Sequence, residues 1–225
     1  MSSKPTIGYW NIRGLAAPLR MAMHYTGTDF EDKTYQCGPA PDFDRSAWNN
    51  EKHNLGLTYP NLPYYIEGDF KLTQSMPILT YICEKFGQGL LGDNPEERSL
   101  IAQVASEFSD YKGALTRICY NSEGKKLVAE GAFDAIVAKL GNTEKFLGAN
   151  EFMVGNKVTY VDFFVWEQLD QLESILPGTL DKYPQLKGYH QRFRNLPQLE
   201  SYFKLETKPF NNTSAAIGAT VESNQ

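Results

Sequence analysis

The chain has 225 residues, of which 41% are hydrophobic and 22% are charged, and its formal charge at pH 7 is −5. This is the composition of a folded globular protein with one large domain or two modest ones, and it excludes a disordered chain. Because the basic residues are scattered along the chain, we expect neither nucleic acid nor an anionic membrane surface as a partner.

No apolar run approaches the roughly 20 residues that a membrane-spanning helix needs. The polar stretch from Met1 to Pro5 lacks the apolar core of a signal peptide, so we expect a cytoplasmic protein. The cysteines are odd in number, lie far apart and form no C-x-x-C pair, which argues against a disulfide scaffold and a dithiol redox motif. They are Cys37, Cys83 and Cys119. The histidines lack ligand spacing as well, and no metal site is predicted.

The first third of the chain alternates between strand and helix signals. The apolar run Thr6–Tyr9 predicts a strand, and apolar residues at three- and four-residue spacing after it predict a helix that ends near Gly27. Three further strands are predicted, over residues 32–36, 64–67 and 71–73. The last two flank Gly68 and Asp69 as a hairpin, and a helix follows from Ser75 to about Phe86. This order is typical of a small α/β layer of the thioredoxin type.

The composition changes over the glycine-rich residues 87–92, which form the best linker candidate. Helical periodicity then dominates, starting at Asn94 and Pro95 as a cap and a first helical residue. Thr159 and Asp162 form a capping-box-like pair at the start of a further helix. We therefore predict a first domain over residues 1–86, an all-helical domain over 94–207 and an irregular, weakly ordered tail over 208–225.

Three short segments carry groups that suit a small anionic peptide with a thiol. Tyr9 places a phenol at a strand end, and a phenolic O–H that donates to a sulfur stabilises the thiolate more than the thiol. Leu62 precedes a proline, which extends its backbone for pairing with a peptide. Gln74 and Ser75 stand at a predicted helix start, where free N–H groups favour an anion. The alternatives are an aromatic residue in the core, a plain turn and a helix cap.

Taken with the Asp42–Trp48 block and the Val158–Phe163 cap, the run Gly-Tyr-Trp-Asn-Ile-Arg-Gly at residues 8–14 resembles glutathione S-transferases, most closely the mu class. The similarity runs in matching order from about Ile7 to about Phe203. It implies a homodimeric enzyme that conjugates the thiolate of glutathione, as co-substrate and with no cofactor, to hydrophobic electrophiles. It also implies that the proline bond after Leu62 is cis.

The resemblance further implies which residues form the site. Tyr9 and Tyr120 would be catalytic, acting on the thiol and on the electrophile respectively. The glutathione contacts would be Tyr9, Trp10, Arg45, Trp48, Lys52, Asn61, Leu62, Gln74, Ser75 and, from the neighbouring subunit, Asp110. Arg45, Trp48 and Lys52 would surround the glycine carboxylate. Ile12, Leu15 and Tyr120 would line the electrophile pocket. Asp110 and Tyr120 lie ten residues apart, so we expect them on roughly one helix face.

Two other functions remain open. A non-catalytic carrier of hydrophobic ligands could use the same fold, although the intact Tyr9 argues against it. A thiol-disulfide oxidoreductase would need a cysteine at Tyr9 or Asn11, and none stands there. Tyr59 and Thr80 depart from the phenylalanine and arginine that are common at mu-class interfaces. The chain after about Lys208 does not match the family, so its part of the pocket stays unassigned.

Overall fold

The computed structural model of the chain describes residues 3–39 and 41–212. Within these residues, the strands of the sheet are β1 (Thr6–Trp10), β2 (Glu31–Tyr35), β3 (Tyr64–Glu67) and β4 (Phe70–Thr73). The helices that accompany the sheet are α1 (Ala17–Tyr25), α2 (Ser46–Asn49) and α3 (Ser75–Phe86). The later helices are α4 (Pro95–Cys119), α5 (Gly124–Ala129), α6 (Asp134–Leu147), α7 (Tyr160–Ile175), α8 (Pro184–Arg194) and α9 (Glu200–Leu205), with the 3₁₀ turns η1 (Thr179–Lys182) and η2 (Pro197–Leu199).

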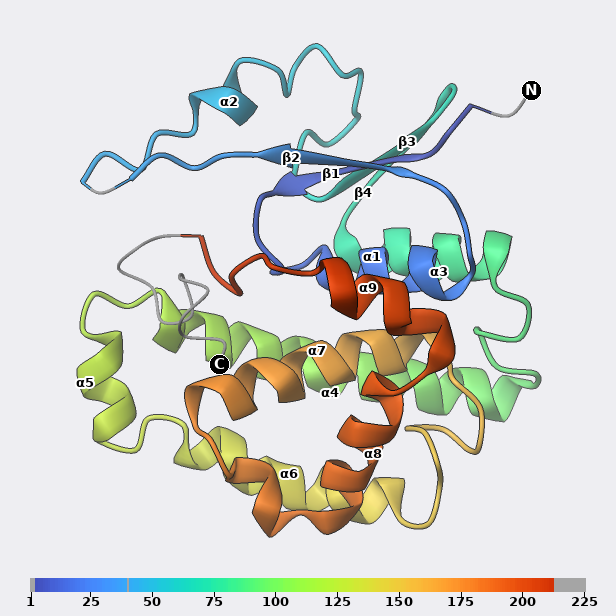
Figure 1. The fold of residues 1–225 in the computed structure, drawn as a ribbon, viewed down its shortest axis with the longest axis vertical. Coiled ribbons are helices and arrows are strands. Elements are labelled where there is room, and N and C mark those ends of the chain that lie inside the picture. The colour runs from blue at the N-terminus through green and yellow to red at the C-terminus, as the bar shows by residue number, and fades with distance from the viewer. Residues whose placement is uncertain (1–2, 40, 213–225) are drawn as a thin grey trace.

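The sheet has the strand order β2-β1-β3-β4, in which β1 and β2 run parallel and the other pairs run antiparallel. Helices α1 and α3 cover the face of the sheet that looks toward the helical part, and α2 lies on the other side (Figure 1). The central strand has no room for a side chain at Gly8, because a Cβ there would lie 2.1 Å from the ring of Tyr64 on β3. The predicted thioredoxin-like layer is confirmed.

The sequence placed these strands within one residue of their observed ends, and it placed α3 over its observed range. The short helix α2 was not predicted. Its four residues carry no apolar repeat, and Trp48 is the one residue of α2 that is buried. This helix forms around a single side chain that the tertiary structure covers.

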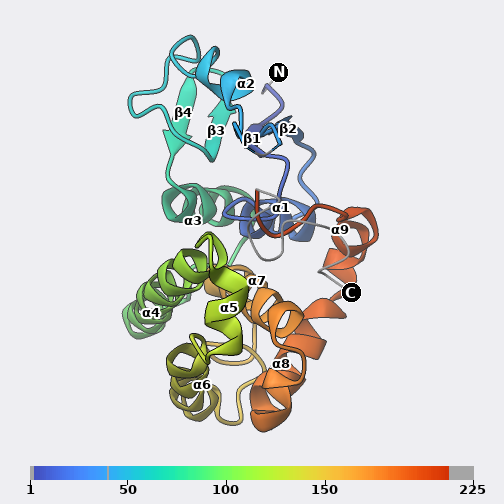
Figure 2. The ribbon, with the colours of Figure 1, turned by 90° about the vertical axis from the view of Figure 1, so that its left-hand side faces the viewer.

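The second part of the chain is helical, as predicted. Helix α4 starts where expected, since the Glu97 N–H donates to the Asn94 side chain at 2.8 Å. Helix α7 lies at the centre and packs against α1 of the first part (Figure 2). Its capping box is present, with the Asp162 carboxylate accepting from the Thr159 N–H at 2.7 Å. The core therefore continues from the layer into the helices.

The sequence predicted an irregular, weakly ordered tail from residue 208. Residues 208–212 form no helix or strand, but Phe210 and Asn211 are buried. The reason is contact with the loop after β1: the Arg13 N–H donates to the Pro209 carbonyl at 2.8 Å, and the Phe210 ring lies 3.9 Å from the Arg13 guanidinium carbon. The rest of the predicted tail, residues 213–225, lies outside the described residues.

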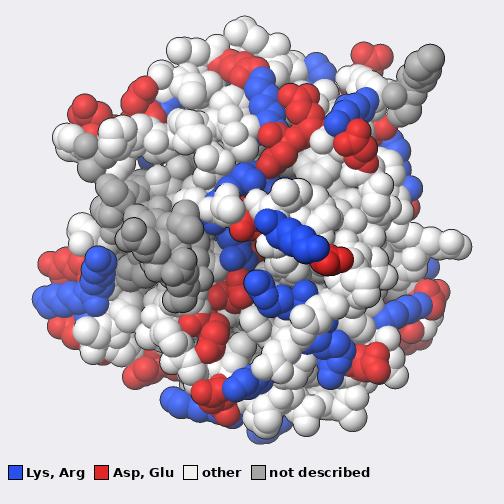
Figure 3. All heavy atoms as spheres, in the orientation of Figure 1, with Lys and Arg blue, Asp and Glu red and all other residues white. Residues whose placement is uncertain are grey.

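The surface agrees with the scattered charges of the sequence. On the face shown in Figure 3, acidic and basic side chains alternate, with no large area of one sign. In the described part of the chain, no helix is both long and apolar enough to cross a bilayer.

Candidate functional site

Tyr9 stands near the end of β1, and its side chain is buried. Its phenolic oxygen accepts a hydrogen bond from the Leu15 N–H at 3.2 Å. Burial raises the pKa of Tyr9 above its ordinary value, although the Leu15 N–H and the charge of Arg20 act in the opposite direction. The phenol is therefore protonated at neutral pH, and its own proton is available to an acceptor in the adjoining pocket.

The loop after β1 passes close to this phenol, and Gly14 makes the approach possible. Its φ is +44°, and a Cβ on it would lie 2.8 Å from the oxygen and from a ring carbon of Tyr9. Any larger residue would be strained and would push the loop off the ring. Gly14 thus sets the distance between Tyr9 and the Leu15 N–H.

A pocket of about 310 Å³ opens beside Tyr9, between the layer and α4. It gathers many of the predicted site residues: Tyr9, Trp10, Ile12, Leu15, Arg45 and Tyr120. Tyr120 follows the last residue of α4, and its hydroxyl accepts from the Asn212 N–H at 2.8 Å. Burial raises the pKa of Tyr120 to about 12, while that hydrogen bond acts to lower it. Both phenols are therefore protonated donors.

Further lining residues were not predicted. They are Gly14, Lys112, Thr116, Asn211 and Asn212. A signal for two of them does exist in the sequence, because Lys112, Thr116 and Tyr120 follow one another at four-residue spacing and so share a helix face. The two asparagines belong to the tail, whose position could not be predicted from the sequence.

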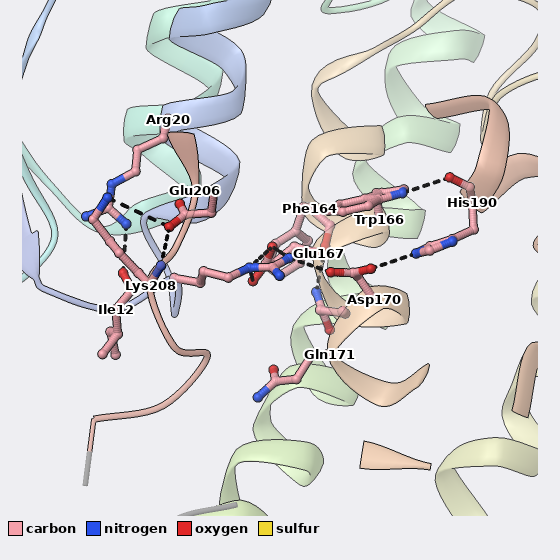
Figure 4. Close-up of polar contacts among 12 residues, drawn as sticks. Ile12, Arg20, Phe164, Trp166, Glu167, Asp170, Gln171, His190, Glu206 and Lys208 are labelled. Atoms are coloured by element: carbon pink, nitrogen blue, oxygen red, sulfur yellow. Dashed lines mark hydrogen bonds and ion pairs between the residues drawn. The ribbon is translucent and has the colours of Figure 1, made fainter. Parts of the chain in front are cut away.

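A buried ion-pair cluster joins the loop after β1 to α7. The Arg13 Nη2 donates to Glu167 at 2.6 Å and to Asp170 at 2.7 Å. Asp170 also contacts the His190 ring at 3.0 Å (Figure 4). Burial would lower the pKa of Arg13, but the two carboxylates outweigh it and raise that pKa. Arg13 stays charged, and it ties the Tyr9 loop to the helical part.

Arg20 and Lys208 extend these contacts on the other side of the same loop. Figure 4 shows both beside Ile12 and Glu206. The Arg20 Nη1 donates to the Ile12 carbonyl at 2.7 Å, and its Nε donates to Asp32 at 2.9 Å. Lys208 lies 3.3 Å from the other oxygen of Asp32. The loop between Tyr9 and α1 is therefore fixed by the sheet, by α7 and by the tail.

The other predicted glutathione contacts do not line the pocket. Trp48 packs on Tyr64 with ring centroids 6.1 Å apart. Lys52 donates to the Asn49 side chain at 3.1 Å. Both belong to the α2 region of the layer, together with Arg45 of the pocket. They can serve as donors to an anion at this end of the site.

The two remaining predicted elements have the expected backbone geometry. The Leu62–Pro63 bond is cis, as the resemblance implied. Neither backbone group of Leu62 bonds to another backbone group in the described part of the chain. Helix α3 begins after Gln74, whose φ is +76°, and no side chain caps it. Its first N–H groups, from Ser75 on, can therefore receive an anion. Asn61 is exposed next to Leu62.

Asp110 does not lie at this pocket. It is exposed and lines a separate cleft between α4 and α6, together with Lys139 and Phe146. Asp110 and Tyr120 therefore line different cavities of the single chain, and the role of Asp110 at the site of a neighbouring subunit stays a prediction. The rotation around the helix axis over ten residues is about 80° short of three full turns. This difference is enough to direct the two side chains to different clefts.

No cluster of three or more potential metal-ligating side chains occurs among residues 3–39 and 41–212. A thioredoxin-like layer, a helical domain and a phenol-lined pocket between them define the class of protein. Family models described as the glutathione S-transferase N-terminal and C-terminal domains match residues 5–84 and 109–206.

Related proteins support the same assignment. The chain is 43% identical to glutathione S-transferase Mu 1 of Oryctolagus cuniculus, over 88% of this chain and 90% of that protein. It is 42% identical to a glutathione S-transferase of Dermatophagoides pteronyssinus, over 97% and 99% of the two chains. The crystal structure of the glutathione S-transferase Blo t 8 superposes with a TM-score of 0.84 at 29% identity, over 95% of this chain and 99% of that one. The chain belongs to the glutathione S-transferase family, and it resembles the mu class.

Proposed function

We propose that this chain is a glutathione transferase that joins the sulfur of glutathione to an electrophilic carbon of hydrophobic compounds. The observation that carries the proposal is the buried phenol of Tyr9, which accepts from Leu15 and keeps its proton for a thiolate in the pocket. A free thiol has a pKa near ~8.5. One charge-assisted hydrogen bond, worth roughly 1.5 to 3 kcal/mol, lowers that pKa by about one to two units.

Glutathione would lie along the layer, with its three parts bound by different elements. Arg45, Trp48 and Lys52 would bind the glycine carboxylate, where a guanidinium, an indole N–H and an ammonium are suitable donors. The backbone of Leu62, beside Asn61, would pair with the cysteinyl unit as an added strand does. The N-terminus of α3, at Gln74 and Ser75, would receive the γ-glutamyl carboxylate. Trp10 would close the site beside the sulfur.

In the reaction, the thiolate forms a carbon–sulfur bond while the electrophile loses a halide or opens a strained ring. The protein contributes the ionised thiol and the proximity of the two reactants. Tyr120 and the apolar side chains of Ile12 and Leu15 would receive the electrophile. When a ring opening or an addition creates an oxyanion, the protonated Tyr120 phenol can donate to it.

Tyr9→Phe tests the role of the phenol. We expect the variant to bind glutathione within a few-fold of the wild type, since the carboxylates of the peptide are bound elsewhere, but to conjugate far more slowly. Ultraviolet difference titration of bound glutathione should show a thiol pKa raised by about one to two units. A carrier that does not catalyse would show the same thiolate absorbance in both proteins, and that result would remove Tyr9 from the mechanism.

We also propose a homodimer in which Asp110 reaches the glutathione of the neighbouring subunit and the exposed Tyr59 packs against the partner. Tyr59 is 73% exposed in the single chain, which suits a side chain that another subunit covers. Equilibrium sedimentation should give about twice the chain mass of 25.4 kDa. A monomer with full activity at micromolar concentration would contradict both the dimer and the role of Asp110. We expect the protein in the cytoplasmic fraction.

A further inference from the structure

The pocket beside Tyr9 has two chemically different walls. The layer contributes the apolar side chains of Ile12 and Leu15. Helix α4 contributes Lys112 and Thr116, which precede Tyr120 at four-residue spacing on one face of the helix. A pocket for purely hydrophobic electrophiles would need no ammonium group on its wall. Binding of apolar compounds therefore does not account for the ammonium group of Lys112 on the α4 wall.

Lys112 is poorly neutralised by the protein itself. Its Nζ donates to the neutral Gln171 side chain at 2.8 Å, and among the described residues no carboxylate oxygen lies within 4.0 Å of it. The nearby Glu167 and Asp170 carboxylates are already bound by Arg13. Burial lowers the pKa of Lys112, the Glu167 charge opposes that effect and the Arg13 charge adds to it. An ammonium in this environment gains from an added anion.

The charged side chains of the pocket have one sign. Among the described residues that line it, the charged side chains are Arg45 and Lys112, and none is Asp or Glu. This is a positive site in a chain whose formal charge is −5. Under the proposed function Arg45 is taken up by the glycine carboxylate of glutathione. Among the described lining residues, Lys112 then remains as a cation on the electrophile side whose hydrogen-bond partner is the neutral Gln171 side chain, with the Thr116 hydroxyl one turn away.

We propose that this pocket selects electrophiles that carry a carboxylate, and that Lys112 is the residue that binds it. The inference rests on the proposed function and names its substrate class. The apolar wall holds the carbon skeleton of the electrophile, Tyr9 holds the sulfur, and Lys112 pairs with the carboxylate. The ion pair forms away from the reacting carbon, so it acts as a specificity contact.

Two chloroarenes with the same ring test the proposal: 4-chloro-3-nitrobenzoate and the neutral 4-chloro-3-nitrobenzamide. The readout is the ratio of their kcat/KM values, in which any general loss of activity cancels. Lys112→Met keeps most of the side-chain length without the charge, and we expect it to lower the benzoate-to-benzamide ratio about tenfold or more. Lys112→Arg should retain the ratio within a few-fold. Lys125→Met removes an exposed charge on α5 and should leave the ratio unchanged.

A second measurement uses the wild-type protein alone, in case Lys112→Met does not fold. The unreactive 3-nitrobenzoate should inhibit competitively against the electrophile at a concentration about tenfold lower than 3-nitrobenzamide does. Equal inhibition by the two, or an unchanged ratio in folded Lys112→Met, would overturn the proposal. The proposal would also be overturned if Lys112→Met raised the thiol pKa of bound glutathione and lowered kcat/KM equally for both substrates. Lys112 would then stabilise the thiolate. If the wild type conjugates neither these chloroarenes nor any epoxide or enone, the proposed function itself fails.

Discussion

The two walls of the pocket are built in different ways. The layer wall, with Tyr9, Ile12 and Leu15, comes from one continuous run of seven residues, in which a strand and the positive φ of Gly14 fix each side chain. The α4 wall comes from a helix about a hundred residues later in the chain and from the tail, and it faces Tyr9 only because the two domains dock. Local structure thus fixes the group that we propose to act on the thiol. Domain docking fixes the groups that we propose to meet the electrophile.

The largest expected effect comes from loosening this docking. Glu167→Ala removes one carboxylate from the buried Arg13 cluster, and breaking a buried pair typically costs roughly 3 to 5 kcal/mol. We expect a loss of unfolding free energy of roughly 3 kcal/mol, near the lower end of that range, because Asp170 still holds Arg13. Urea denaturation measures it.

A matched control is available on the surface. Lys204→Ala removes an exposed ion pair between Lys204 and Glu200, and side chains so exposed contribute little because solvent screens them. If Glu167→Ala were as stable as Lys204→Ala, the Arg13 cluster would not be what joins the two walls.

The layer wall can be tested without disturbing the α4 wall. Arg45→Ala removes a contact that is made equally before and during the reaction, so KM for glutathione should rise about tenfold or more while kcat stays near its wild-type value. Steady-state kinetics with glutathione varied measures both constants. Arg117→Ala, at an exposed arginine outside the pocket lining, is the control and should change neither. A fall in kcat at constant KM would show that Arg45 does not bind the glycine carboxylate.

The smallest effect, and the most selective, is expected for the α4 wall. Tyr120→Phe removes a donor to a developing oxyanion, and turnover of epoxides and enones should fall about threefold to tenfold, since a phenol that is 42% exposed is worth less than a fully desolvated donor. Chloroarene conjugation develops no such oxyanion. It should be unchanged, or faster where product release is limiting, because the Asn212 N–H loses its acceptor. Equal loss on all three substrate types would assign Tyr120 to packing.

Much of the layer could be predicted from the chain because its signals are local. The strand before Gly14, the hairpin at Gly68 and Asp69, and the start of α3 at Ser75 each follow from a few neighbouring residues. Ile12 and Leu15, which the resemblance assigned to the electrophile pocket, line the pocket beside Tyr9. The roles of these residues stay predictions, as do the domain boundaries at residues 86, 94 and 207.

What only the tertiary structure decided is which distant residues meet. Nothing in the sequence pairs Arg13 with Glu167, 154 positions away, because a salt bridge leaves no periodic pattern. The packing of Phe210 on Arg13 was missed for the same reason, since the polar residues around Phe210 predicted a weakly ordered tail. Lys112 lines the pocket because α4 packs beside Tyr9. A sequence determines local conformation through short-range sterics and hydrogen bonds, whereas the charge and shape of a pocket between domains depend on how separately formed surfaces pack.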